Sequence, residues 1–258
     1  MSVKQLFDLV GRTAVVTGGS RGLGLQMAEA LGEMGARIAI TARKKDELDD
    51  AVAHLKAQGI AATAYVNDLG KREQVAPLAT ELLAKFGKVD ILVNNAGATW
   101  GAPAEDHPME AWDKLVSLNM SGMFQLSQLV AKHSMIPAKW GRIINIASVN
   151  GIQATDMRLL KNVAYVATKH GVVGLTRQLA TEWGCHGITV NAICPGFFPS
   201  RMTKSTLDTA GEWVKQGTPT GRLGGDEDLK GLVVLLASDA SRHITGQAIA
   251  VDGGATLI

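Results

Sequence analysis

The chain has 258 residues, 46% hydrophobic and 19% charged, which is enough apolar material to bury a large core. Its net charge of +2 excludes a strong electrostatic attraction to nucleic acid or to an anionic membrane, so neither partner is expected. The two cysteines, Cys185 and Cys194, lack metal-binding spacing, and no metal site is expected. The sequence has neither a bilayer-length apolar run nor a secretory signal, so we expect a cytoplasmic protein.

Seven short runs rich in valine and isoleucine alternate with longer segments of helical periodicity. The expected strands are Thr13–Thr17, Arg37–Thr41, Ala62–Val66, Ile91–Val93, Ile143–Ile146, Ile188–Ala192 and Ala248–Val251, and the clearest helical segments are Leu25–Met34 and Asp46–Gln58. Continuous apolar character is typical of parallel strands covered on both faces. The order predicts an α/β fold, in which residues 1–258 form a single Rossmann-type domain with a doubly wound parallel sheet.

A glycine-rich loop, TGGSRGLG over Thr17–Gly24, lies between the first expected strand and the first expected helix. Glycines let the backbone turn sharply and approach a bulky anion, and a helix N-terminus favours a pyrophosphate. The spacing differs from the common G-x-G-x-x-G, and a plain tight turn is the alternative, but the strand–loop–helix context favours a dinucleotide. The expected contacts in this loop are Gly18, Ser20, Arg21, Gly22, Leu23 and Gly24.

The end of the second strand, Thr41–Lys44 (TARK), carries no acidic residue. A site selective for NAD usually has an acid there for the ribose 2′-hydroxyl, whereas arginine suits the 2′-phosphate of NADP. Arg21 in the glycine loop could approach the same phosphate from the other side, unless both arginines are solvated surface charges. We therefore expect NADP(H) in preference to NAD(H), with Arg43 and Lys44 among the cofactor contacts.

Tyr165 and Lys169 form a Y-x-x-x-K pair, whose side chains share one face of a helix. An ammonium beside a phenol favours phenolate and lowers the phenol pKa, which suits a group that exchanges a proton with a substrate hydroxyl. Ser148 follows an apolar run at the carboxyl end of a strand, where its hydroxyl could bind a carbonyl oxygen. The structural alternatives are an amphipathic helix face for the pair and a cap of the next turn for the serine.

These motifs, in this order, resemble the short-chain dehydrogenase/reductase family over nearly the whole chain. The glycine loop resembles the family's T-G-x-x-x-G-x-G, Asn94–Gly97 its N-N-A-G, and the tail GQAIAVDGG its last strand. The resemblance implies that Tyr165 is the general acid/base and that Lys169 lowers its pKa and holds the nicotinamide ribose. It also implies that Ser148 orients the carbonyl and that Asn119 anchors a water that relays protons. The further cofactor contacts it implies are Asp68, Leu69, Asn95, Ala96, Gly97, Pro195, Gly196, Phe198 and Ser200, besides Tyr165 and Lys169.

Two segments beside the expected cleft bear on the substrate. Sixteen residues separate Ser148 from Tyr165, a longer connection than is usual in the family, and the extra length falls in Gly151–Val163, here called the insertion. By resemblance, residues from about 196 to 225 form a lid over the substrate. Large apolar side chains in this region predict a pocket for an acyl or otherwise apolar ketone, unless they pack internally or at a subunit contact. The expected substrate contacts are Trp100, Ser148, Phe197 and Met202.

We therefore expect an NADPH-dependent carbonyl reductase that acts on a 3-oxoacyl thioester or a similar apolar ketone. Closer resemblance is divided between 3-oxoacyl reductases, including the rhamnolipid-type branch, and gluconate 5-dehydrogenases. The basic residues Arg158, Lys161, Arg201 and Lys204 could equally meet a phosphate group or a sugar acid, so a polyol or sugar-acid dehydrogenase is the first alternative. A non-catalytic NADP(H)-binding sensor is the second, disfavoured because a sensor needs no proton relay.

Two partners are expected by resemblance alone. Reductases that use an acyl carrier protein tend to carry basic residues where this chain has Lys139 and His186, which leaves such a carrier open as a partner. Single surface charges are usually solvated, so this signal is weak. The family commonly forms homotetramers, and we expect a homotetramer here.

Overall fold

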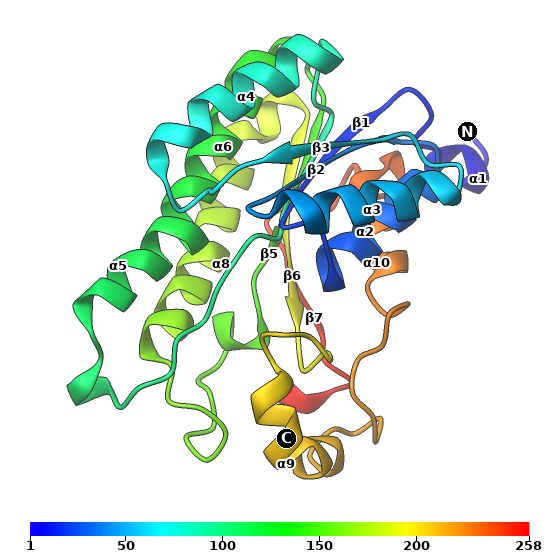
Figure 1. Cartoon of the computed structure of the whole chain (residues 1–258). Coiled ribbons are helices and arrows are strands. Elements are labelled where there is room, and N and C mark those ends of the chain that lie inside the picture. The colour runs from blue at the N-terminus through cyan, green and yellow to red at the C-terminus, as the bar shows by residue number, and fades with distance from the viewer. Residues whose placement is uncertain (258) are drawn as a thin grey trace.

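The computed structural model describes residues 1–257, which contain one seven-stranded sheet with helices on both faces (Figure 1). All neighbouring strands are parallel, and their order is β3-β2-β1-β4-β5-β6-β7. The strands are β1 (Thr13–Thr17), β2 (Arg37–Ala42), β3 (Ala62–Val66), β4 (Ile91–Asn94), β5 (Gly141–Ile146), β6 (Ile188–Pro195) and β7 (Ala248–Val251). The predicted doubly wound α/β fold is confirmed.

Every expected apolar run coincides with a strand, and the runs for β1, β3 and β7 have the bounds that the sequence predicts. Strands β1, β4, β5 and β6 are buried along their whole length, whereas β3 and β7 lie at the two sheet edges and are partly exposed. The edge position of β3 explains why its apolar run is the weakest of the seven, because an edge strand needs less apolar surface.

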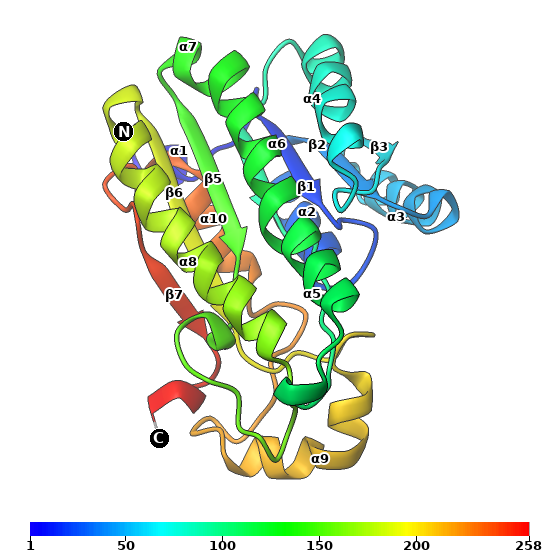
Figure 2. The ribbon, with the colours of Figure 1, turned by 90° about the vertical axis from the view of Figure 1, so that its left-hand side faces the viewer.

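Helices cover both faces of the sheet, with α4, α5, α6 and α8 on one side and α2, α3 and α10 on the other (Figures 1 and 2). Successive residues of a strand pack against the two helical layers in turn: Ala14 and Val16 pack on one side and Val15 on the other. The helices are α1 (Val3–Leu6), α2 (Gly22–Glu33), α3 (Lys45–Ala57), α4 (Arg72–Phe86), α5 (Met109–Val116), α6 (Met123–Val130), α7 (Ile136–Ala138), α8 (Val163–Trp183), α9 (Lys204–Gln216) and α10 (Lys230–Ala237).

Two short segments of π-helix, η2 (Ser117–Gly122) and η3 (Ala131–Met135), join α5, α6 and α7. Helix α2 begins at Gly22, three residues before the predicted Leu25, because the last glycines of the loop form its first turn. Among residues 1–257, no helix combines the length and the apolar character that a membrane span requires.

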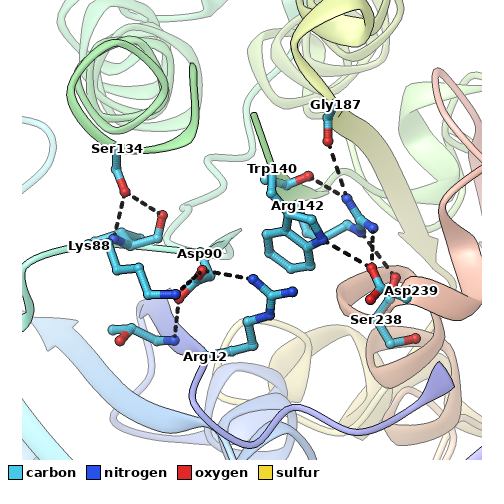
Figure 3. A network of polar contacts seen from close by, with 12 residues as sticks. Arg12, Lys88, Asp90, Ser134, Trp140, Arg142, Gly187, Ser238 and Asp239 are labelled. Atoms are coloured by element: carbon cyan, nitrogen blue, oxygen red, sulfur yellow. Dashed lines mark hydrogen bonds and ion pairs between the residues drawn. The ribbon is translucent and has the colours of Figure 1, made fainter. Parts of the chain in front are cut away.

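A buried carboxylate, Asp90, ties together the amino ends of two strands (Figure 3). Its Oδ2 accepts a hydrogen bond from the backbone N–H of Thr13 at 2.9 Å. Its Oδ1 accepts from Arg12 Nη1 at 3.2 Å and from Lys88 Nζ at 3.0 Å. The start of β1 is thereby held against the residue that precedes β4.

Trp140, just before β5, lies between two arginines in the same region (Figure 3). The guanidinium carbons of Arg12 and Arg142 are 3.6 Å and 4.3 Å from its ring centroid. Arg142 is buried and donates to the Ser238 carbonyl and to Asp239, each at 3.0 Å, at the end of α10. The side of the sheet at which the strands begin, here called the amino edge, thus carries charged groups that all have partners in the protein.

Candidate active site

A cleft of about 410 Å³ opens at the carboxyl ends of β1, β2, β3 and β4. The strand order reverses between β1 and β4, and this is the place where doubly wound sheets bind nucleotides. The predicted contacts that line the cleft are Gly18, Ser20, Arg21, Gly22, Leu23, Gly24, Arg43, Lys44, Asp68, Leu69, Asn95, Ala96, Gly97, Ser200 and Met202. The lining residues absent from the predicted contacts are Thr41, Ala42, Glu47, Asn67, Leu118 and Arg201.

The glycine loop is fixed to the N-N-A-G segment by side chains of both. Thr17 Oγ1 accepts from the backbone N–H groups of Asn95 and Ala96, each at 3.0 Å, and Asn95 Nδ2 donates to the Thr17 carbonyl at 2.9 Å. A Cβ on Gly24 would collide with the Gly18 carbonyl and with the Asn95 amide, so only glycine permits this close approach. The loop is therefore held in one shape before any ligand arrives.

The residues of the cleft fit a dinucleotide. Gly18 and Gly22 have φ of +63° and +52°, and a Cβ on Gly22 would meet nothing within 4 Å, so backbone along this wall is open to a ligand. The side-chain oxygen of Asn67, which lines the cleft after β3, is a buried acceptor without a partner. Arg43 and Lys44 are exposed cations at the end of β2. An adenosine with a charged ribose substituent suits this set of groups.

An acid that the sequence reasoning missed lies among these cations. Glu47, in the first turn of α3, contacts Arg21, Lys44 and Arg201 through its two carboxylate oxygens. The absence of an acid from Thr41–Lys44 therefore does not mean that the cleft lacks one. The signal for it in the sequence was an acidic residue about one helical turn after the basic residues that follow β2.

Lys169 lies where the cleft ends. Its Nζ donates to the Ile146 carbonyl at the end of β5, at 2.7 Å, and lies 5.6 Å from the centroid of the Tyr165 ring. A Cβ built on Gly97, a lining residue, would be 3.7 Å from this Nζ. Ser148 caps the turn after β5 by accepting from the Asn150 N–H at 3.1 Å. Ser148, Tyr165 and Lys169 thus gather at the carboxyl ends of the strands.

Asn119 ties two parts of this region together. It is buried in the π-helical segment η2, accepts from the Ala98 N–H at 3.0 Å and donates to the Ala98 carbonyl at 3.0 Å. It also donates to Thr168 Oγ1 at 3.1 Å, next to Lys169 on α8. Its side chain therefore holds the segment after N-N-A-G against the helix that carries Tyr165 and Lys169. A π-helical turn at this position is typical of functional sites.

Burial shifts the pKa values of both Tyr165 and Lys169. Burial raises the pKa of the phenol above its ordinary value, and the nearby Ser148 side chain only partly offsets this. Burial also lowers the pKa of Lys169, to about 8. In the protein without a dinucleotide, desolvation is thus the main influence on the phenol pKa, and the lowering by Lys169 beside a bound nicotinamide stays a prediction.

Several predicted contacts lie outside the cleft lining. Phe198 is buried in the core below the lid, packs on Gly224, and lines a smaller cavity of about 120 Å³ together with Phe197. Both residues therefore lie outside the lining of the main cleft. Pro195 ends β6, and Gly196 donates its N–H to the Val251 carbonyl of β7 at 3.0 Å. Trp100 is half-exposed after N-N-A-G.

The insertion contacts both neighbouring segments. The guanidinium carbon of Arg158 is 4.9 Å from the ring centroid of Trp213, on the lid helix α9. Lys161 accepts through its carbonyl from the Ala102 N–H at 2.8 Å, in the segment after N-N-A-G. Figures 1 and 2 show α9 beyond the carboxyl ends of the strands, close to this loop. The insertion thus contacts the lid on one side and the segment after N-N-A-G on the other.

The fold and the motifs are matched by known proteins. The model of the short chain dehydrogenase family matches residues 12–211. A gluconate 5-dehydrogenase of Gluconobacter oxydans is 38% identical, over 100% of this chain and 99% of its own. A 3-oxoacyl-[acyl-carrier-protein] reductase of Staphylococcus epidermidis is 37% identical, over 95% and 99%. The crystal structure of a gluconate 5-dehydrogenase from Burkholderia cenocepacia with NADP and tartrate is 36% identical, covers 100% of both chains, and has a TM-score of 0.93.

The fold and the site thus define an oxidoreductase that acts on alcohol or ketone groups. The chain belongs to the short-chain dehydrogenase family, as its motifs predict.

Proposed function

We propose that the protein is an NADP(H)-dependent carbonyl reductase in which Asn119, Ser148, Tyr165 and Lys169 form the catalytic group. The observation that carries the proposal is the arrangement of Ser148, Tyr165 and Lys169 around the carboxyl end of β5, beside Gly97 of the cleft lining. Structural ion pairing does not account for this arrangement, because Lys169 donates to a backbone carbonyl and contacts no carboxylate among residues 1–257.

The roles of the residues follow from their atoms. The Ser148 hydroxyl donates to the substrate carbonyl oxygen and stabilises the charge that develops there. The Tyr165 phenol gives its proton to the same oxygen in the reductive direction. Lys169 orients the ribose next to Tyr165, and Asn119 fixes α8 against the loop. The bound NADPH supplies the hydride.

The preference for NADP(H) over NAD(H) is part of this proposal. Arg43 and Lys44 are exposed at the end of β2 and line the cleft, in the position that a 2′-phosphate would occupy. Guanidinium and ammonium groups bind phosphate through charge-assisted hydrogen bonds. The proposed contacts with the adenosine and the pyrophosphate are Gly18, Ser20, Arg21, Gly22, Leu23, Gly24, Asp68 and Leu69, and those toward the nicotinamide are Asn95, Ala96, Gly97, Pro195, Gly196, Phe198 and Ser200.

An apolar ketone, such as a 3-oxoacyl thioester, is the proposed substrate. Trp100, Met157, Met202 and Trp213 are between 42% and 73% exposed, and they lie on the segments that border the site. Exposed large apolar side chains around one opening favour an apolar ligand. The lid, about residues 196–225, and the insertion are proposed to close over it, as the contact between Arg158 and Trp213 supports.

A sugar acid is the second candidate. The relatives named gluconate 5-dehydrogenase cover the whole chain, and the insertion carries Arg158 and Lys161 at the same opening. Arg158 is paired with Asp156, which reduces the charge it offers to a carboxylate. This pairing is the reason for placing the apolar ketone first.

The two candidates are separated by measuring NADPH oxidation with acetoacetyl thioester, a simple diketone and 5-ketogluconate under identical conditions. We expect the highest kcat/KM with the thioester. A higher value with 5-ketogluconate would reverse the substrate assignment and leave the reaction class intact. Tight NADP⁺ binding without turnover of any ketone would instead favour the sensor. The homotetramer, the carrier-protein partner and the cytoplasmic location stay predictions.

A further inference from the structure

The carboxylate of Glu47 lies on the cleft wall, within reach of three cations from different parts of the chain. Arg21 Nη1 is 2.7 Å from Oε2 and 2.8 Å from Oε1. Lys44 Nζ is 3.2 Å and Arg201 Nη1 is 2.9 Å from Oε1. All four residues line the cleft. The Glu47 side chain is 18% exposed, whereas the cations are 47% to 66% exposed, so the acid is the fixed centre of the cluster.

The cluster coincides with the site proposed for the 2′-phosphate. Arg21 comes from the glycine loop and Lys44 from the end of β2, next to Arg43. A phosphate and a carboxylate are both acceptors and both anions, so they need the same N–H donors and repel each other at close range. A 2′-phosphate beside Arg21 and Lys44 would therefore compete with Glu47 for these cations and lie close to its negative charge, whereas a dinucleotide without the phosphate leaves the pairs undisturbed.

Arg201 gives the cluster a second connection. It belongs to the lid, after β6, while Glu47 belongs to α3 beyond β2, so their contact joins the two sides of the cleft. Both residues of the contact line the cleft, so it bridges the space that a bound nucleotide would occupy.

We propose that Glu47 is a specificity-determining residue, whose carboxylate competes with the 2′-phosphate for Arg21 and Lys44 and, through Arg201, holds the lid against α3. The inference rests on the proposed use of NADP(H). It predicts that the acid weakens the preference for NADP(H) that the surrounding cations create.

Glu47 is ionised at neutral pH, as this competition requires. Burial raises its pKa, but the contacts with Lys44 and Arg201 and the charge of Arg21 together lower the pKa by more. The pKa of Glu47 therefore lies below its ordinary value. The opposite role for Glu47 is to accept the ribose 2′-hydroxyl of NAD(H), as acids near this position do in NAD-selective sites. The two roles give opposite results when the charge is removed.

The test is isothermal titration calorimetry of NADP⁺ and NAD⁺ with the wild type, Glu47→Gln and Asp50→Asn. Asp50 is exposed on the same helix and lies outside the cleft lining, so its variant reproduces the change in net charge alone. We expect Glu47→Gln to tighten NADP⁺ binding about tenfold with little change for NAD⁺, and Asp50→Asn to change neither appreciably.

The other outcomes are distinguishable. Weaker NAD⁺ binding by Glu47→Gln, with unchanged NADP⁺ binding, would assign the acid to the ribose hydroxyl and overturn the inference. Equal tightening by Asp50→Asn would reduce the effect to net charge and also overturn it. If the wild type does not bind NADP⁺ at all, the proposed function itself fails.

The lid contact has its own test, the release rate of NADPH and NADH followed by stopped-flow fluorescence. Arg201→Gln should speed release of both dinucleotides by a similar factor, because it cuts the link across the cleft without removing a phosphate contact. Faster release of NADPH alone would make Arg201 a phosphate ligand and overturn the proposed link.

Discussion

Charged residues have opposite environments at the amino edge of the sheet, where the strands begin, and at the carboxyl edge, where the strands end. At the amino edge, Asp90 and Arg142 are buried and each has several partners in the protein. At the carboxyl edge, Arg43 and Lys44 are exposed, and glycines replace side chains along the cleft wall. The polar groups of the amino edge hold strands together, whereas those of the carboxyl edge are exposed on the wall of a cleft. Substitutions at the two edges should therefore have separable effects on stability and on function.

The sharpest test of this separation is Tyr165→Phe. Loss of the phenol oxygen removes the proton donor, so turnover should fall about 10²- to 10⁴-fold while NADP⁺ binding and the urea midpoint stay nearly unchanged. The matched control is Tyr65→Phe, since Tyr65 is the only other tyrosine and lies on β3 against Phe86. The measurements are steady-state kinetics, calorimetry and urea unfolding. Full activity in Tyr165→Phe would remove the proposed mechanism.

The amino edge should show the reverse pattern in Asp90→Ala. This variant leaves the Thr13 N–H and the cations Arg12 and Lys88 without their acceptor, which should lower the free energy of unfolding by about 3 kcal/mol. KM and kcat should not change at a temperature where the variant is folded. Asp49→Ala, which removes an exposed carboxylate paired with Lys45, should cost far less. Equal losses of unfolding free energy in the two variants would show that the buried network around Asp90 contributes no more to stability than an exposed ion pair.

Removal of a charge at the carboxyl edge should affect dinucleotide binding and not stability, and the variant Arg43→Ala tests this. Loss of its hydrogen bonds to a phosphate should weaken NADP(H) binding about ten- to a hundredfold and leave NAD(H) binding and the urea midpoint unchanged. Lys45→Ala removes a neighbouring cation outside the cleft lining and serves as the control. Calorimetry measures both dinucleotides, and an equal loss for the two would place the 2′-phosphate elsewhere.

The smallest effect is expected for Lys169. This residue lies at the carboxyl edge but is buried, like the charged residues of the amino edge. Burial lowers its pKa to about 8 from 10.5, so the unfolded chain binds more protons than the folded one between these values. Stability of the wild type should therefore rise with pH through that window, relative to Lys169→Met, by on the order of 1 kcal/mol. Urea unfolding of both proteins at pH 7.5 and 9.5 measures the difference. Parallel behaviour would show that Lys169 titrates normally.

Much of the fold could be predicted because strands buried on both faces need continuous apolar runs, which are visible in the sequence. The glycine loop and the Tyr165–Lys169 spacing were equally visible, since local geometry alone puts each set together. Glu47 was not, because its contact with Arg201 depends on how a helix and a distant segment meet across the cleft. The burial of Phe198 likewise depends on close packing against Gly224.

The direction of the Tyr165 pKa could not be predicted for a different reason. The sequence places the ammonium near the phenol but does not say how deeply both are buried. Burial acts on the two groups in opposite directions, raising the pKa of Tyr165 and lowering that of Lys169, and it dominates both.

The placement of Trp140 between two guanidinium groups has an experimental consequence. Its indole lies at the edge farthest from the cleft, while Trp213 lies under Arg158 on the lid. Variants that keep Trp140 or Trp213 as the only one of the five tryptophans would carry an intrinsic optical probe for a single event: emission from Trp140 would report chain unfolding, and emission from Trp213 would report movement over the bound ligand.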